Sequence, residues 1–424
     1  MGSSREHAKR GGNKLTRFLA PFGRAVKTMQ QTTTVRRRSG REKAIRRIQS
    51  FVAGATLAFG FILIQDLMFK DPYQERATAW AIAFLVALVY AGVIVSTDRN
   101  EKEPWQMLLV CFLWGTVVSG SIAFFLNTTW INLIEPELMA RGYKMFSIAP
   151  YTEELTKGAI LLILWYASDE FDNALDGIIY GALVGIGFAM AENAHFFKEA
   201  LEKSPDQFFL NRYFLNVFFS RAVLGGLASH ATYTAITGVG LGFSRQTQRK
   251  WLKIVLPLLG LVVAILAHAL WNSDTVGYML CLNLIPSIIE SGCWRRTVKA
   301  VFLMGPFILG VIVAIILSWR KEARVIAGQL AVEMDPDDPY IAPNVMLTVR
   351  GRFRARWRTL RTRGISAWWT LRQLQQTLIK LAFCKKWRGE DRDALSAFRR
   401  RTQLLRSQLE SGDALPEAGK KHEQ

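Results

Sequence analysis

The sequence predicts an all-α, polytopic membrane protein with about eight transmembrane helices and a basic cytoplasmic extension at each end. Of its 424 residues, 50% are hydrophobic and 21% are charged, while the mean hydropathy is +0.14. These values are compatible because the charged residues are separated from the apolar segments. The apolar segments are roughly 18–22 residues long, which is the length that crosses a hydrocarbon core of roughly 30 Å.

Eight apolar segments are predicted to cross the membrane, and together they define a transmembrane domain over residues 48–319. We place them at about 48–68, 77–96, 105–126, 145–166, 175–197, 213–243, 252–272 and 299–319. The stretch from Tyr278 to Ile289 is also apolar, but it is short and contains Pro286. We interpret it as a re-entrant or interfacial piece rather than a ninth crossing.

Basic segments orient the predicted bundle. Residues 1–47 form a basic arm whose only acids are Glu6 and Glu42, so we expect the N-terminus to be cytoplasmic. Eight crossings return the C-terminus to the same side, as expected for a multi-pass protein of a cell membrane, and the pattern looks bacterial. The net charge of +20 therefore indicates topology and attraction to anionic lipid, and we do not expect nucleic-acid binding.

The segment 320–410 is predicted to be a basic, partly amphipathic cytoplasmic tail. Residues 350–363 contain seven arginines and no acid. Large apolar residues then recur at roughly helical spacing: Trp368, Trp369, Leu371, Leu374, Leu378 and Leu381. This pattern is typical of an amphipathic helix on the inner membrane surface, where it would contact anionic lipid. Residues 411–424 are predicted to be disordered.

Five ionisable side chains lie inside the predicted spans. They are Glu153, Glu154, Glu192, His230 and His268. A charged side chain at mid-membrane costs roughly 2.5–3.5 kcal/mol on the insertion scales. Because these residues are spread over four spans, they require a common explanation. Glutamate and histidine are also the residue types that activate water or hold a metal.

The first motif is Glu-Glu-x-x-Lys on an apolar helix. Glu153 and Lys157 are one helical turn apart, and Glu154 is also within reach of Lys157. We expect the ammonium to neutralise one carboxylate and leave the other free as a general base. A structural ion pair that joins helices is the alternative interpretation.

The remaining ionisable residues suit a metal site. Two histidines and one glutamate form a ligand set known for catalytic zinc, with a position left open for water. We therefore expect Glu192, His230 and His268 either to bind a metal, most plausibly zinc, or to position the water directly. Asn272 lies one turn after His268 and would donate to the tetrahedral oxyanion.

Four motifs carry a resemblance to a known family. EELTK, GFAMAEN, SHATYT and HALWN occur in this order within 105–275. This arrangement resembles the PrsW family of intramembrane proteases, which is related to the CAAX prenyl proteases and the bacteriocin-immunity group. The resemblance implies an endopeptidase that cleaves a single-span membrane protein, with first-site cleavage of an anti-sigma factor as the activity linked to relatives. Because the second motif ends in Glu192 rather than histidine, a prenylated CAAX substrate is not expected.

The resemblance implies roles for the glutamate pair. Glu153 would act as the general base, and Glu154, held by Lys157, would support it, although the two could be exchanged. Two other function classes stay open from the residues alone: an ion-coupled transporter that uses buried Glu and His, and a non-enzymatic membrane scaffold. Many carriers contain internal repeats, and the two halves of the span region show no similarity. Cys281 and Cys293 share the proposed outer loop, where they would either pair or remain free thiols.

Overall fold

The computed structural model describes residues 45–60, 73–133, 148–168, 170–203, 212–273, 297–387 and 392–411. Every regular element within these ranges is helical, which confirms the predicted all-α fold class. The apolar piece Tyr278–Ile289, both Cys281 and Cys293, most of the N-terminal arm and the tail beyond 411 lie outside the described residues.

Residues 45–60 are helical, and the named elements follow in chain order. They are α2 (Tyr73–Thr97), α3 (Trp105–Leu113), η1 (Trp114–Ser119), α4 (Gly120–Leu133), α6 (Ala149–Ala167), α7 (Ala174–Glu202), α8 (Arg212–Phe218), η4 (Phe219–Leu224), η5 (Leu227–Ala231), α9 (Thr232–Gln246), α10 (Leu252–Asn272), η7 (Lys299–Met304), α13 (Gly305–Leu330), α14 (Pro343–Met346), α15 (Val349–Trp387) and α16 (Arg392–Ser411). The elements marked η are π-helical turns.

Five helical segments among the described residues are long and apolar enough to cross a membrane. They are Gln74–Thr97, Trp105–Trp130, Ala174–Glu202, Leu252–Asn272 and Lys299–Leu330. The predicted span at 145–166 is present as the 19-residue helix α6, which carries Glu153, Glu154 and Lys157. The predicted span at 213–243 is divided among α8, η4, η5 and α9, and part of the span at 48–68 lies outside the described residues. The count of eight therefore stays a prediction.

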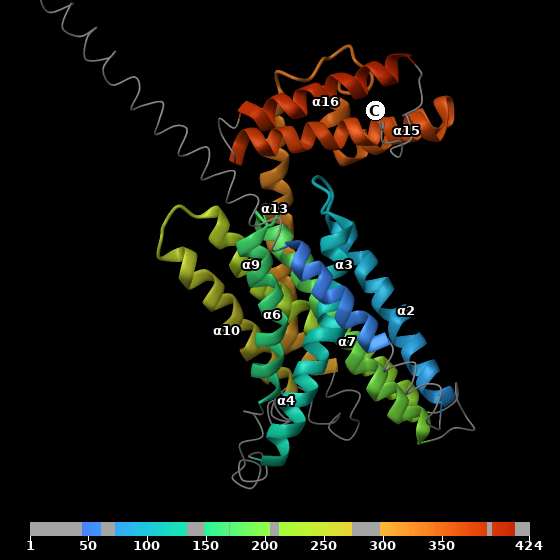
Figure 1. Cartoon of the computed structure of the whole chain (residues 1–424), viewed down its shortest axis with the longest axis vertical. Helices are drawn as coiled ribbons and strands as arrows, with labels where there is room; N and C mark the ends of the chain where they lie inside the picture. The colour runs from blue at the N-terminus through green and yellow to red at the C-terminus, as the bar shows by residue number, and fades with distance from the viewer. Residues whose placement is uncertain are drawn as a thin grey trace, which may run out of the picture.

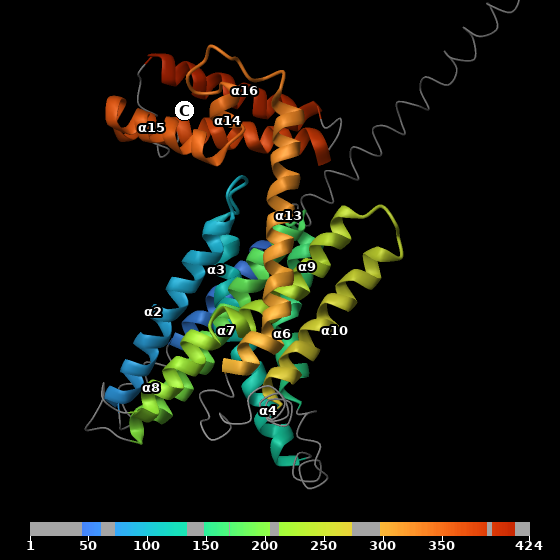
Figure 2. The same cartoon turned by 180° about the vertical axis from the view of Figure 1, so that it is seen from behind.

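Helix α7 is the central helix of the bundle (Figures 1 and 2). It begins with a capping box, in which Asn173 accepts from the backbone N–H of Asp176 and the Asp176 side chain accepts from the backbone of Asn173. Most of its residues are buried, and its glycines allow close packing against α9. A Cβ on Gly177 would overlap the backbone of Gly238, and a Cβ on Gly185 would overlap the backbone of His230. Small residues thus bring η5 and α9 directly against α7, as is common between helices in lipid.

The chain bends immediately before His230. Ser229 has non-helical dihedral angles (φ −118°, ψ −121°), and the surrounding turns η4 and η5 are π-helical. Such π turns interrupt the regular 3.6-residue periodicity, so the direction of a side chain after the bend differs from that in a straight helix. The bend therefore sets the side of the bundle that His230 faces.

The C-terminal helices form a second cluster above one end of the bundle (Figure 1). Helix α13 runs from the bundle into this cluster, where its last turns pack against α15 and share one hydrophobic core with α15 and α16. The cluster has its own hydrophobic core, which contains Leu330, Leu371, Leu374 and Leu378. The predicted amphipathic face of the tail is therefore largely covered by other parts of the same chain, because Leu371, Leu374 and Leu381 are fully buried.

Candidate active site

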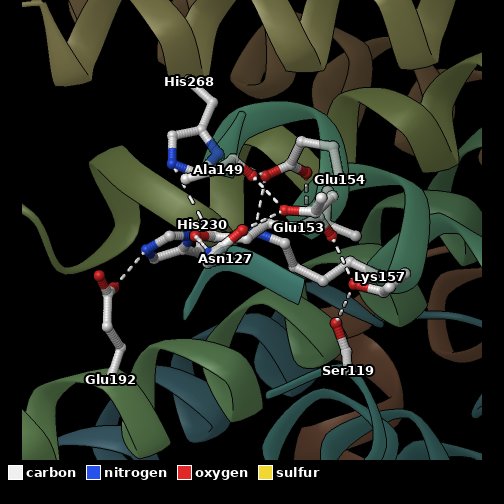
Figure 3. A network of polar contacts seen from close by, with 12 residues as sticks. Ser119, Asn127, Ala149, Glu153, Glu154, Lys157, Glu192, His230 and His268 are labelled. Atoms are coloured by element: carbon white, nitrogen blue, oxygen red, sulfur yellow. Dashed lines mark hydrogen bonds and ion pairs between the residues drawn. The ribbon is translucent and has the colours of Figure 1, made fainter. Parts of the chain in front are cut away.

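The bundle brings five of the sequence-predicted site residues together in one network (Figure 3). Glu153 and Glu154 come from α6, Glu192 from α7, His230 from η5 and His268 from α10. All except Glu192 are buried. Four separate helical elements therefore contribute polar groups to one point inside an otherwise apolar bundle.

Glu154 is the most completely bonded member of the network. Its Oε1 accepts hydrogen bonds from Lys157 Nζ at 2.6 Å and from His268 Nδ1 at 2.9 Å. Its Oε2 accepts from the hydroxyl of Thr234 at 3.4 Å. Glu154 and Lys157 are both inaccessible to solvent, so each neutralises a charge that would otherwise be unpaired in the interior. Glu154 is thus held by Lys157, and its supporting role in catalysis stays a prediction.

His230 is oriented by a carboxylate on α7. Its Nε2 donates to Glu192 Oε2 at 2.7 Å, and its Nδ1 accepts from Lys157 Nζ at 3.0 Å. Glu192 also forms an ion pair with Arg221, whose Nε donates to Asn193 Oδ1 at 3.0 Å. A carboxylate that accepts the N–H of one ring nitrogen leaves a lone pair on the other, as in many metal-binding histidines.

Glu153 has a buried oxygen whose hydrogen-bonding capacity is unused. Its Oε1 accepts from Asn127 Nδ2 at 3.3 Å, but its Oε2 has no hydrogen-bond partner among the described residues. This Oε2 lies 3.8 Å from His230 Nδ1 and 3.8 Å from His268 Nε2. An unsatisfied buried acceptor costs roughly 1–3 kcal/mol, more for a charged group, so such an atom needs an explanation.

The network contains a donor set for a metal ion. One ligand atom each from Glu153, His230 and His268 lie within 4.8 Å of one another, and all three residues are buried. Zinc is bound by histidine nitrogens and carboxylate oxygens at roughly 2.0–2.2 Å, so its ligands lie a few ångströms apart. The Lys157 ammonium lies 3.6 Å from Glu153 Oε2, so this carboxylate is already paired with one positive charge. The residues therefore fit a divalent metal.

Comparison with known proteins identifies the family of the chain. Residues 103–289 match the model of the PrsW family, described as intramembrane metalloproteases. The chain is 31% identical over 195 residues to Protease PrsW of Bacillus subtilis, covering 43% of this chain and 78% of that protein. It is 28% identical over 165 residues to Protease PrsW of Geobacillus kaustophilus, covering 38% of this chain and 66% of that protein. The chain belongs to the PrsW family. No solved structure matches it.

The PrsW match covers the whole network and leaves out both ends of the chain. Glu153, Glu192, His230 and His268 all lie within residues 103–289. The C-terminal cluster built from α14, α15 and α16 lies outside the match. PrsW membership therefore makes this chain an intramembrane protease, and the function of the C-terminal cluster must be inferred from its own residues.

The roles predicted for Glu192 and Asn272 stay predictions, and the structure places these two residues as follows. The sequence predicts Glu192 as the carboxylate of the metal set, but in the structure Glu192 contacts the Nε2 of His230, and the carboxylate grouped with the two histidines is that of Glu153. Asn272 is the last residue of α10, and its side chain is exposed. Its predicted contact with the oxyanion stays a prediction.

The structure adds three residues to the network that the sequence interpretation missed. They are Asn127, Arg221 and Tyr233. The Tyr233 ring stacks on His268 with centroids 4.9 Å apart, at an interplanar angle of 17°. Arg221 could have been found from the sequence, because a cation inside the predicted span 213–243 requires a partner in the same way as the acids do. Asn127 could not have been found in this way, since it is uncharged and lies just beyond the predicted third span.

Proposed function

We propose that the Glu153 carboxylate activates the water that hydrolyses a peptide bond within the membrane. The observation that carries this proposal is the free Oε2 of Glu153, which is buried and faces one nitrogen of each histidine. A general base must present an oxygen that is not already engaged. Glu154 is a poorer candidate because both of its oxygens accept hydrogen bonds.

The proposed reaction assigns a step or a contact to each fixed group. Glu153 takes a proton from the attacking water, and later gives that proton to the nitrogen of the departing amine. Asn127 holds the other oxygen of Glu153 and orients the carboxylate. The Glu154–Lys157 ion pair and the Glu192–His230 contact keep the two imidazole rings in place. Asn272 is proposed to donate to the oxyanion that forms at the substrate carbonyl.

We further propose that His230, His268 and a Glu153 oxygen hold the metal and that the metal is zinc. The support is the donor set and the description of the family as metalloproteases. When bound, zinc would lower the pKa of a coordinated water toward about 7. Glu153 is thus proposed both to take a proton and to contact the metal. Glutamine at this position would affect the two functions differently, because its amide oxygen can contact a metal but cannot take a proton.

The proposed substrate is a single-span membrane protein such as a membrane-bound anti-sigma factor, which this protein would cleave at the first site. The support is the burial of the network inside a bundle whose helices are long enough to cross a membrane. A peptide bond must therefore enter the bundle at membrane depth to reach Glu153. The proposed location is the plasma membrane, with both termini in the cytoplasm, supported by the basic extensions.

Cleavage of a library of single-span membrane peptides by the purified full-length protein tests the proposal. Glu153→Gln keeps a side-chain oxygen that can bind zinc, but this oxygen cannot accept a proton. We therefore expect bound zinc to persist while kcat falls by roughly 10²–10⁴-fold. His268→Ala should lose both zinc and activity. The matched control is Glu199→Gln on the exposed surface of α7, which should behave as wild type. A Glu153→Gln variant with normal activity would overturn the proposal, as would proton- or cation-driven flux through a wild-type protein that cleaves nothing.

A further inference from the structure

Helix α15 contains two helical halves that fold back on each other. Gly364, at the join, has φ +80°, a backbone conformation that residues with a Cβ rarely adopt. The first half carries Phe353, Arg356 and Trp357, and the second half carries Trp368 and Arg372. Residues from both halves line one pocket, although they are far apart along the chain.

This pocket is lined by cations and aromatic rings and has a volume of about 210 Å³. Its cations are Lys102, Arg356 and Arg372, and its rings are those of Phe353, Trp357 and Trp368. Pockets for drug-sized ligands are larger, at roughly 300–1,000 Å³. The pocket therefore suits a small anionic group rather than a large organic ligand.

Two of the three cations of the pocket, Arg356 and Arg372, are not neutralised by acids among the described residues, whereas the Lys102 ammonium donates to the Asp98 carbonyl. Within the part of the chain that the structure describes, neither Arg356 nor Arg372 forms an ion pair, and Arg372 instead lies over the rings of Trp368 and Trp369, at 5.8 and 5.1 Å from their centroids. Burial lowers the pKa of Arg356, and the neighbouring charge of Arg372 lowers it further. Two like charges held together in a partly buried site favour the binding of an anion.

The pocket lies beside the end of a candidate membrane span. Lys102 belongs to the short connection between α2, which ends at Thr97, and α3, which begins at Trp105. Gln376 of α15 fixes this connection, since its Nε2 donates to the Asn100 carbonyl at 3.3 Å and its Oε1 accepts from the Lys102 N–H at 3.4 Å. Figures 1 and 2 show α15 across the end of the bundle, close to this connection.

The surface around the pocket has the composition of a membrane interface. Trp105 is 67% exposed at the start of α3, and Phe353 is 60% exposed beside the pocket. Aromatic side chains are enriched at the level of the lipid headgroups, and arginines near the surface attract anionic lipids. The Leu371 and Leu374 side chains are buried in the C-terminal core, so contact with lipid must come from this aromatic and basic side of α15 instead.

We propose that this pocket binds the headgroup of an anionic phospholipid, with the phosphate contacting Lys102, Arg356 and Arg372. The acyl chains of that lipid remain in the leaflet beside α2 and α3, and the aromatic rings lie against its glycerol region. The bound lipid bridges the α2–α3 connection and α15, and it thereby holds the C-terminal cluster against the end of the bundle.

Lipid binding by the purified full-length protein tests this site. We would measure the binding of phosphatidylglycerol and phosphatidylcholine by native mass spectrometry from detergent. Wild type should retain phosphatidylglycerol more tightly than phosphatidylcholine, and the double variant Arg356→Gln/Arg372→Gln should lose roughly 10- to 30-fold in affinity for it. The matched control is Arg354→Gln/Arg358→Gln, which removes the same charge from exposed positions of the same helix and should bind as wild type.

Two further experiments distinguish loss of charge from loss of folding, and a lipid site from a site for free anions. Arg356→Lys/Arg372→Lys retains the charge and should recover most of the binding even if the glutamine pair destabilises the cluster. Glycerol phosphate, the soluble headgroup, should compete only at far higher concentrations than the lipid. Equal loss in the control pair, or equal affinity for the two lipids, would overturn the proposal. Displacement by glycerol phosphate at the concentration of the lipid would also overturn it and indicate a site for free anions.

Discussion

Glu192 Oε2 lies 2.7 Å from His230 Nε2, on the side of the imidazole ring opposite to Glu153. This contact crosses from α7 to η5 and gives the two glutamates different relationships to the same histidine. Glu153 lies on the side of Nδ1, which also accepts from Lys157 Nζ at 3.0 Å, whereas Glu192 accepts the proton of Nε2. The sequence alone could not distinguish these two positions.

The first prediction concerns Glu192→Gln. An amide oxygen can still accept the His230 N–H, but the negative charge that raises the basicity of the ring is lost. We expect metal affinity and kcat/KM to fall roughly 10–100-fold, as for other outer contacts of metal ligands. Metal titration and peptide cleavage measure both quantities.

His230→Ala supplies the comparison for that variant, because it removes the ring itself and should abolish measurable metal binding. If Glu192→Gln and His230→Ala lose metal to the same extent, Glu192 is a direct ligand, as the sequence predicted. A variant with unchanged affinity and activity would show that the contact only packs the helices.

The residues of the network could be found from the sequence because each is ionisable within an apolar segment. Glu153, Glu154 and Lys157 are also close in sequence on one helix, so their ion pairs follow from helical spacing. The partner of Glu192 could not be found in this way. It depends on the bend at Ser229 and the π turns around it, which place His230 against α7. Hydrophobic periodicity contains no signal for such a bend.

The second prediction concerns the buried ion pair between Glu154 and Lys157. Lys157→Met leaves the Glu154 carboxylate in the interior without its ammonium, which should lower the free energy of unfolding by about 3–5 kcal/mol. The double variant Glu154→Gln/Lys157→Met removes both charges and should recover most of that loss. Thermal unfolding in detergent measures the difference.

Activity should not follow stability in this pair of variants. Glu154 also accepts from His268 Nδ1, so the double variant is expected to fold but to cleave poorly. Full activity in the stable double variant would mean that the ion pair serves folding alone. If Lys157→Met and Glu154→Gln/Lys157→Met are equally unstable, the Lys157 ammonium does not compensate a buried charge on Glu154.

The tail shows what amphipathic periodicity can and cannot predict. The recurrence of Leu371, Leu374 and Leu378 correctly indicated a helix with one apolar face. Periodicity does not identify the partner of that face, however, and here the partner is the chain itself through Leu405 and Leu409 of α16. The membrane and a protein core are both apolar, so only the tertiary structure distinguishes them.

The third prediction concerns the contact between α7 and α9. A Cβ at Gly177 would overlap the carbonyl oxygen of Gly238, and these are backbone atoms that cannot rotate away. Gly177→Ala should therefore separate the two helices and cost roughly 1–3 kcal/mol. Because η5 continues into α9, we expect His230 to shift and activity to fall about 100-fold, which peptide cleavage measures.

Gly158→Ala on α6 is the matched control for that variant. Its Cβ would meet Thr237 Cγ2 at 3.7 Å, which is an ordinary van der Waals distance. This variant should retain stability and activity. If Gly177→Ala behaves like Gly158→Ala, the close approach of α7 and α9 is not required for the geometry of the site.

The fourth prediction concerns Glu103, in the connection between α2 and α3, and the pH dependence of stability. Burial raises the pKa of Glu103 from 4.5 to about 8, and the nearby Asp98 carboxylate adds to the increase, while a hydrogen bond from the Tyr180 hydroxyl opposes it. Below about pH 4.5, Glu103 is protonated in both the folded and the unfolded chain. Between about pH 4.5 and 8, the unfolded chain has lost this proton and the folded chain has kept it.

The free energy of unfolding should therefore decrease as the pH rises through this interval, and the contribution of Glu103 should level off above about pH 8. Glu103→Gln cannot titrate but can still accept from Tyr180, so its unfolding temperature should decrease less over the same interval. Asp98, whose pKa burial raises to about 6, is present in both proteins and leaves a smaller slope in each. Thermal unfolding in detergent at pH 5, 6, 7 and 8 measures the two slopes, with Glu199→Gln as an exposed control. Parallel curves for wild type and Glu103→Gln would show that Glu103 is ionised in the folded protein across the whole interval.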